Sequence, residues 1–90
     1  METMTQEEMR NIYEEISDFI YYNTWRSYHC SYYCGEVNFS TSTSIQFDVY
    51  VTSDQDEGAE WTEHWSIDND GKIYTEDDVY NSIEDFKRDW

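Results

Sequence analysis

The sequence predicts an α+β fold, in which an antiparallel sheet of three or four strands is flanked by an N-terminal and a C-terminal helix. Apolar residues recur every three or four positions near both ends of the chain, and every second position between residues 37 and 67. The first spacing is typical of a helix with one buried face, and the second of strands with one buried face. The chain has 90 residues, three glycines and no proline, so no linker is visible and we expect one compact domain over residues 1–90.

An N-terminal helix is expected over about residues 5–22. Thr5 and Glu8 have the spacing of a capping box, in which each side chain accepts a hydrogen bond from the backbone N–H of the other residue. The apolar stripe that follows consists of Met9, Ile12, Tyr13, Ile16, Phe19 and Ile20. Acidic residues occupy the other faces of this helix.

Strands are expected between residues 27 and 67, where Tyr, Ser and Thr are frequent and apolar residues alternate with polar ones. The first strand passes through Val37 and Phe39. Along the second strand, Ile45, Phe47, Val49 and Val51 alternate with Gln46, Asp48 and Tyr50. The third strand is expected over about residues 60–67.

The segment Asp68-Asn69-Asp70-Gly71 predicts a tight turn, because Gly71 can adopt a positive φ. Residues 72–74 either form a short fourth strand or lead onward.

The C-terminal helix is expected to begin after Thr75. Thr75 and Asp78 resemble an N-cap pair, and Lys87 and Arg88 lie in the last turn, where the helix dipole favours cations. The apolar stripe of this helix consists of Val79, Tyr80, Ile83, Phe86 and Trp90. We expect both helices to cover the same face of the sheet.

The charge of the chain is strongly negative. Twenty-one acidic residues oppose five Lys and Arg residues, for a net charge of −16. A net charge of about two to eight in magnitude is enough to keep a small domain soluble. The excess excludes direct binding to nucleic acid or to an anionic membrane and favours a strongly basic partner. Four Trp, nine Tyr and four Phe supply a core, so a folded domain with a dense acidic surface is expected.

The acids are concentrated in the second half of the chain. Residues 48–90 hold fourteen acids and three bases, a net charge of −11, whereas residues 1–47 have a net charge of −5. We expect one continuous acidic face formed by Asp54, Asp56, Glu57, Glu60, Glu63, Asp68, Asp70, Glu76, Asp77 and Asp78. Duplex DNA carries about one charge per 1.7 Å of its axis, and carboxylates at a comparable density can block a groove lined by Lys and Arg. Exposed tyrosines at Tyr28, Tyr32 and Tyr33 would add contacts to such a partner.

In size, charge and element order, the whole chain resembles the small acidic inhibitors made by phages and mobile elements. These include anti-CRISPR proteins, anti-restriction proteins and uracil-DNA glycosylase inhibitors. The resemblance includes no specific motif, so no residue role is carried over. It implies an inhibitor that binds a basic nucleic-acid-binding protein, with a CRISPR effector nuclease or surveillance complex as the first candidate, and occludes its DNA-binding surface by mimicry of DNA.

The N-terminal ten residues are acidic and polar, unlike a secretory signal, and no stretch approaches the roughly 20 apolar residues of a membrane span. We therefore expect the protein in the cytoplasm of the host cell, without a membrane partner.

The aromatic residues offer an alternative to mimicry. The chain could be an acidic adaptor module that binds a basic host protein through exposed Tyr28, Tyr32 and Tyr33, with the charge only steering the encounter. The same rings are available to a second copy of the chain, as in a homodimer.

A calcium-binding module is a further alternative. Residues 66–77 resemble an EF-hand loop, with Gly71 at position six and Ile73 at position eight. Ser66 replaces the usual Asp at position one, and Asp77 replaces the bidentate Glu at position twelve. The simpler interpretation of this segment is a hairpin turn that leads into a capped helix.

Metal binding and catalysis receive little support elsewhere. His29, Cys30, Cys34 and His64 are soft ligands, but His29 is adjacent to Cys30, which is awkward for one zinc ion. Nothing in the sequence positions Cys30 or Cys34 beside His64 as nucleophile and base, although a local Cys30–Cys34 disulfide remains open. No other catalytic motif occurs, so we expect no enzyme and no cofactor.

Overall fold

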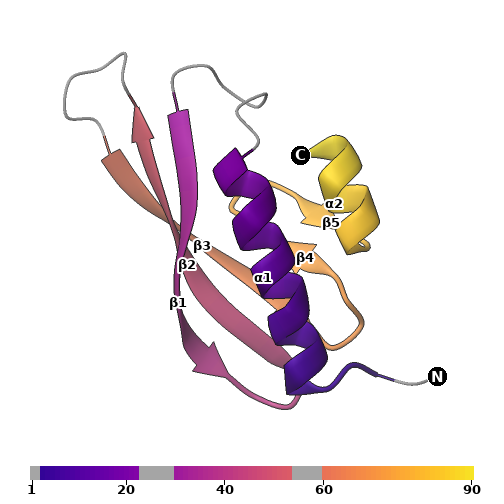
Figure 1. The fold of residues 1–90 in the computed structure, drawn as a ribbon. Coiled ribbons are helices and arrows are strands. Elements are labelled where there is room, and N and C mark those ends of the chain that lie inside the picture. Colours follow the sequence, from indigo (N-terminus) through magenta and orange to yellow (C-terminus); the bar gives the residue numbers. More distant parts are fainter. Residues whose placement is uncertain (1–2, 23–29, 54–59) are drawn as a thin grey trace.

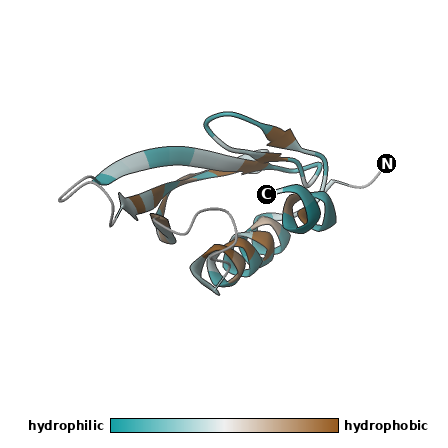
Figure 2. Cartoon of the chain, turned by 90° about the horizontal axis from the view of Figure 1, so that it is seen from above, coloured by the Kyte–Doolittle hydropathy of each residue, from teal (hydrophilic) through white to brown (hydrophobic). Residues whose placement is uncertain are grey.

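The computed structural model describes residues 3–22, 30–53 and 60–90, and it has the predicted α+β architecture (Figure 1). The elements in chain order are α1 (Gln6–Tyr22), β1 (Cys30–Ser40), β2 (Ser44–Ser53), β3 (Glu60–Asp68), β4 (Ile73–Tyr74), β5 (Val79–Tyr80) and α2 (Ile83–Asp89). The strands form one antiparallel sheet in the order β1-β2-β3-β4-β5. In Figure 2 both helices lie on the same side of this sheet, as expected.

Helix α1 begins as the capping box predicts. The Thr5 backbone N–H donates to Glu8 Oε1 at 3.2 Å, and the Glu8 backbone N–H donates to Thr5 Oγ1 at 3.2 Å. The buried residues of α1 are Met9, Ile12, Ile16 and Ile20. Their spacing of three and four places them on one stripe, which packs against β1, β2 and β3.

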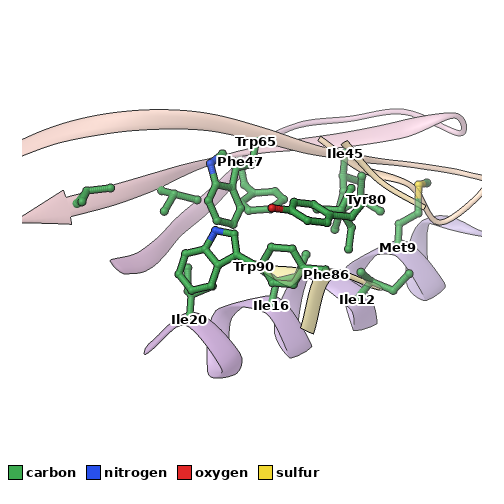
Figure 3. Close-up of a cluster of buried hydrophobic side chains, with 14 residues drawn as sticks. Met9, Ile12, Ile16, Ile20, Ile45, Phe47, Trp65, Tyr80, Phe86 and Trp90 are labelled. Carbon is green, nitrogen blue, oxygen red and sulfur yellow. The ribbon is translucent and has the colours of Figure 1, made fainter. Parts of the chain in front are cut away.

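A cluster of fourteen buried hydrophobic residues lies between the helices and the sheet (Figure 3). Trp65 of β3 is close to its centre, and its rings meet those of Phe47 at 6.3 Å, Phe86 at 5.8 Å and Trp90 at 6.0 Å between centroids. Each such edge-to-face pair adds about 0.5–1.5 kcal/mol beyond area burial. The aromatic contacts of Phe86 and Trp90 therefore attach the short helix α2 to the rest of the fold.

Strand pairing decides which face of the sheet each side chain occupies, because residues directly opposite each other point the same way. In β2 the residues Ile45, Phe47, Val49 and Val51 are buried and face the helices. The intervening residues point to the other side, where Asp48 pairs with His64 of β3 and Tyr50 pairs with Tyr33 of β1. We call these two sides the helix-covered face and the helix-free face.

The expected start of the C-terminal helix is wrong. Thr75 and Asp78 close the turn between β4 and β5, since the Thr75 N–H donates to the Asp78 carbonyl at 2.9 Å and the Asp78 N–H donates to Thr75 Oγ1 at 3.1 Å. Helix α2 begins at Ile83, and Ser82 Oγ accepts from the Asp85 N–H at 3.1 Å as its N-cap. Val79, expected in the apolar stripe of the helix, lies in β5 and is 57% exposed.

The physical reason is that a cap pair and a tight turn use the same hydrogen bond. Thr, Ser, Asp and Asn side chains bond to nearby backbone groups in both settings. The β-branched Val79 and the aromatic Tyr80 favour a strand after the turn. The sheet therefore has five strands, one more than the largest number expected.

The predicted turn at residues 68–71 is confirmed, with Gly71 at a φ of 86°. Asp68 organises it: Oδ1 accepts from the backbone N–H groups of Asp70 and Lys72, each at 3.0 Å, and Oδ2 accepts from the Tyr74 hydroxyl at 2.8 Å. This last bond raises the pKa of Tyr74. No helix within the described ranges has the length and apolar character needed to cross a bilayer.

Candidate protein-binding face

Within the described residues, no helix covers the helix-free face of the sheet (Figure 2). Register places the following residues there from β1, β2 and β3: Ser31, Tyr33, Phe39, Gln46, Asp48, Tyr50, Thr52, Glu60, Thr62, His64 and Ser66. Tyr33 is 44% exposed, Tyr50 38% and Phe39 52%, although all three belong to regular strands. Exposed aromatic residues in a rigid sheet are the residue type that most often anchors a protein–protein interface.

Tyr33 and Tyr50 form the aromatic centre of this face. Their ring centroids are 5.6 Å apart with an interplanar angle of 48°. The Tyr50 ring also lies against Gly35, where an added Cβ would be 2.6 Å from Tyr50 Cε2. The absence of a side chain at Gly35 therefore lets the ring approach closely, and the β1–β2 pairing becomes irregular directly after Cys34.

A hollow of about 340 Å³ lies beside these two rings. Among the described residues, its lining consists of Tyr33, Tyr50, Val51, Thr52, Glu60, Trp61 and Thr62. The lining includes residues of both faces, because Val51 and Trp61 belong to the helix-covered face by register. The other five belong to the helix-free face, and they are two tyrosines, two threonines and Glu60.

A second polar group lies further along β2 and β3. Asp48 Oδ1 is 2.8 Å from His64 Nδ1 and accepts from Asn38 Nδ2 at 3.0 Å. The His64 backbone N–H, on the side of β3 away from β2, donates to Glu76 Oε1 at 2.7 Å. These bonds tie three strands and the β4–β5 turn together, so Asp48 and Glu76 have structural roles as well as charge.

The predicted acidic residues do not gather at one point. Glu60 begins β3 and Asp68 ends it, so they are about 26 Å apart along the strand. Asp70 lies in the β3–β4 turn, and Glu76, Asp77 and Asp78 are exposed at the turn between β4 and β5. Asp54, Asp56 and Glu57 lie outside the described residues.

Glu63 lies on the helix-covered face, unlike Glu60. Its carboxylate accepts from Trp61 Nε1 at 3.1 Å and from Trp65 Nε1 at 2.9 Å. Since both oxygens already receive indole N–H groups, Glu63 holds the side chains of Trp61 and Trp65 in position.

The predicted tyrosines also lie on different faces of the sheet. Tyr33 is part of the helix-free face, whereas Tyr32 is half-buried and packs edge to face on Trp90 at 4.9 Å between centroids. Tyr28 lies outside the described residues.

The acidic side chains of the described residues all remain in contact with solvent, because none is buried. Arg88 is one of four Lys and Arg residues in this part of the chain, and it pairs with Asp85 at 3.1 Å and Asp89 at 3.0 Å. Hydrogen bonds and charge attraction from Arg88 lower the pKa of Asp89. Within the described residues, most acidic side chains therefore form no ion pair with a Lys or Arg residue.

The cysteines do not form the sites that their sequence spacing left open. Cys30 and Cys34 are four residues apart in the regular part of β1, or about 13 Å, and a disulfide needs Cα atoms within about 7 Å. Both lie on the helix-covered face, whereas His64 lies on the helix-free face, so neither thiol can pair with that imidazole. Burial raises the pKa of Cys34 to about 12, opposed by a hydrogen bond to Ser17, and an unreactive thiol results at neutral pH.

The segment compared with an EF-hand loop is a β-hairpin. Residues 66–68 belong to β3, residues 73–74 to β4, and the Asp68 carboxylate is occupied by its own turn. Among residues 3–22, 30–53 and 60–90, no group of three or more His, Cys, Asp or Glu side chains is arranged to hold a metal ion.

Sequence reasoning did not select Asp48 or Tyr50 as site residues, and it considered His64 only as a metal ligand or a base. The sequence nevertheless contained a pattern that indicates two of them, because the alternation of β2 places Asp48 and Tyr50 on the face away from the buried residues. Only the pairing with β1 and β3 shows that Tyr50 meets Tyr33 and that Asp48 meets His64.

Comparison of the chain with protein-family models, with curated proteins and with solved structures finds no match.

Proposed function

We propose that this protein is an inhibitor that binds a strongly basic, nucleic-acid-binding protein in the cytoplasm of a host cell and occludes its nucleic-acid-binding surface. The observation that supports this proposal is the display of charge: the chain has a net charge of −16, and no acidic side chain of its described residues is buried. Such a surface repels phosphates and attracts a groove lined by Lys and Arg. The first candidate target is a CRISPR effector nuclease or surveillance complex, as the resemblance to anti-CRISPR proteins implies.

The arrangement of the acids suggests how the surface is used. Glu60, Glu76 and Asp70 follow β3 and its adjoining turns over the length of the strand, as phosphates follow a duplex. A linear array of this kind neutralises several cations of a groove at once and makes association fast and sensitive to salt.

The test is a pull-down from a lysate that contains CRISPR and restriction effectors, with elution by duplex DNA. A DNA-binding effector that is captured and then released by DNA is the expected result. A captured partner that DNA does not release would contradict occlusion of the nucleic-acid-binding surface.

Charge reversal locates the contact on the inhibitor. We expect a triple change of Asp54, Asp56 and Glu57 to Lys to abolish capture. The matched control changes Glu7, Glu14 and Glu15 of α1 to Lys, with the same change in net charge. Equal capture by the two triple variants would show that the predicted acidic residues are not the contact.

A second candidate function is an acidic adaptor that binds a basic host protein through its aromatic surface. The exposure of Tyr33 and Tyr50 on a helix-free sheet face favours it. A large loss of capture on Tyr33→Ala, together with little effect of charge reversal and no release by DNA, would select this function over occlusion.

A further inference from the structure

We infer that the hollow beside Tyr33 and Tyr50 binds one arginine side chain of the basic partner, an inference that rests on the proposed function. The residues that line it from the helix-free face are these two tyrosines, the hydroxyl-bearing Thr52 and Thr62, and Glu60. An aromatic face attracts a cation that lies over it, and a carboxylate beside the ring supplies the opposite charge.

The size of the hollow limits its occupant. A volume of about 340 Å³ is at the lower end of the about 300–1,000 Å³ that small-molecule sites occupy. One extended side chain matches this space better than a folded segment of a partner. Occupation by a phosphate-bearing ligand is opposed by Glu60 and by the net charge of −16.

Arginine fits the lining better than lysine does. The guanidinium group is planar, so it can stack on a tyrosine ring while its edge donates two hydrogen bonds to one carboxylate. It is also less strongly hydrated than an ammonium group, which lowers the cost of leaving water. Glu60 is exposed and makes no ion pair with another residue of the described segments, so its carboxylate is available.

The hollow can be reached from the edge of the sheet. Strand β4 pairs with β3 only at Ser66 and Ile67, so within the described segments no strand lies beside the N-terminal half of β3. The Glu76 carboxylate covers the His64 N–H on this edge, and the edge continues from there to Glu60. An arginine from a partner can therefore enter beside Glu60 without displacing any strand of the described segments.

The rings that would stack on the arginine are held in place before it binds. Tyr50 lies against the bare backbone of Gly35 and against Tyr33, so neither ring has to be ordered on binding. Rigid aromatic groups lose little conformational freedom in a complex, and this increases the affinity of the contact.

The experiment is calorimetric titration with two probes, hexa-arginine and hexa-lysine, at low ionic strength. The test variants are Tyr50→Leu and Glu60→Gln. The matched controls are Tyr22→Leu and Glu15→Gln, which remove an exposed ring and an exposed acid from α1. Near-ultraviolet circular dichroism of each variant checks the fold.

The parent protein is expected to bind hexa-arginine more tightly than hexa-lysine. Each test variant should weaken binding of hexa-arginine by about fivefold, and each control by no more than about twofold. Amide signals of Tyr33, Tyr50 and Thr62 should move in a nuclear magnetic resonance titration of the parent with hexa-arginine.

The failure of this inference can be told apart from the failure of the proposed function. If both peptides bind and the test variants equal their controls, the hollow is not an arginine site, although a basic partner remains supported. If neither peptide binds at low ionic strength, the proposal of a basic partner is itself contradicted. Glu60→Gln is isosteric and exposed, so it decides the question even if Tyr50→Leu fails to fold.

Discussion

On the helix-covered face of the sheet, the rings of Phe47, Trp65 and Phe86 meet edge to face inside a cluster in which no polar residue is buried. On the helix-free face, Tyr33 and Tyr50 meet each other and remain open to solvent. Both faces therefore carry aromatic residues, but in different roles. On the helix-covered face, ring packing stabilises the fold, whereas on the helix-free face a rigid sheet presents rings beside carboxylates. Substitutions on the two faces should separate loss of stability from loss of binding.

The largest effect is expected from Trp65→Ala. Trp65 is 2% exposed and contacts three other aromatic rings, so its removal leaves a cavity and should lower the free energy of unfolding by about 3–5 kcal/mol. The measurement is urea unfolding followed by far-ultraviolet circular dichroism. Trp61→Ala is the matched control, because Trp61 lies on the same strand and face but is 44% exposed. Equal losses for the two variants would mean that burial does not distinguish them.

The next effect concerns pH and Cys34. Burial raises the pKa of this thiol from 9.0 to about 12, so the folded state holds its proton more tightly than the unfolded state. The resulting stabilisation is complete below pH 9.0 and is lost as the pH rises toward 12.

Between pH 8 and pH 10, the free energy of unfolding should fall with pH more steeply for the parent than for Cys34→Ala. The two slopes should differ by at most about 1.4 kcal/mol per pH unit. The two proteins differ only at residue 34, so the difference in slope reports on Cys34. Parallel slopes would indicate that the thiol is not held in its protonated form by the fold.

A loss of comparable size is expected from Gly35→Ala on the helix-free face. The new Cβ would lie 2.6 Å from Tyr50 Cε2, so the ring must move and the free energy of unfolding should fall by about 1–3 kcal/mol. The control is the double variant Gly35→Ala with Tyr50→Ala, in which no ring remains to clash. If the cost of Gly35→Ala is the same with and without the Tyr50 ring, the close approach is not its cause.

The smallest effect is expected from Ser82→Ala, which removes the N-cap of α2. Loss of the bond from the Asp85 N–H to Ser82 Oγ should cost about 1 kcal/mol of unfolding free energy. Ser42→Ala changes an exposed serine of the β1–β2 connection and should cost less than about 0.5 kcal/mol. An unchanged stability of Ser82→Ala would place the start of the helix elsewhere.

The sequence alone was sufficient where the controlling contacts are local. The capping box of Thr5 and Glu8, the stripe of α1 and the turn at Gly71 involve residues within a few positions of one another, and all were predicted correctly. The alternation of β2 was equally reliable, because a strand with one buried face has a period of two.

Local sequence patterns gave a wrong prediction where the same residues fit two different structures. Thr75 with Asp78 fits a helix cap and a tight turn equally well, and the choice depends on Tyr80 and Phe86, which pack together at 5.3 Å between ring centroids. The start of α2 at Ile83 was therefore decided by packing between segments.

The candidate site was even more dependent on tertiary structure. The sequence by itself determined that the surface is acidic, that aromatic residues can supply the core, and that Tyr50 points away from the buried side of β2. Only strand pairing decided that Tyr50 lies on Gly35, that Asp48 meets His64, and that Cys34 and His64 occupy opposite faces. The physical reason is that side-chain direction follows from the period of one strand, whereas a contact between strands depends on register, which is set by the packing of the whole sheet.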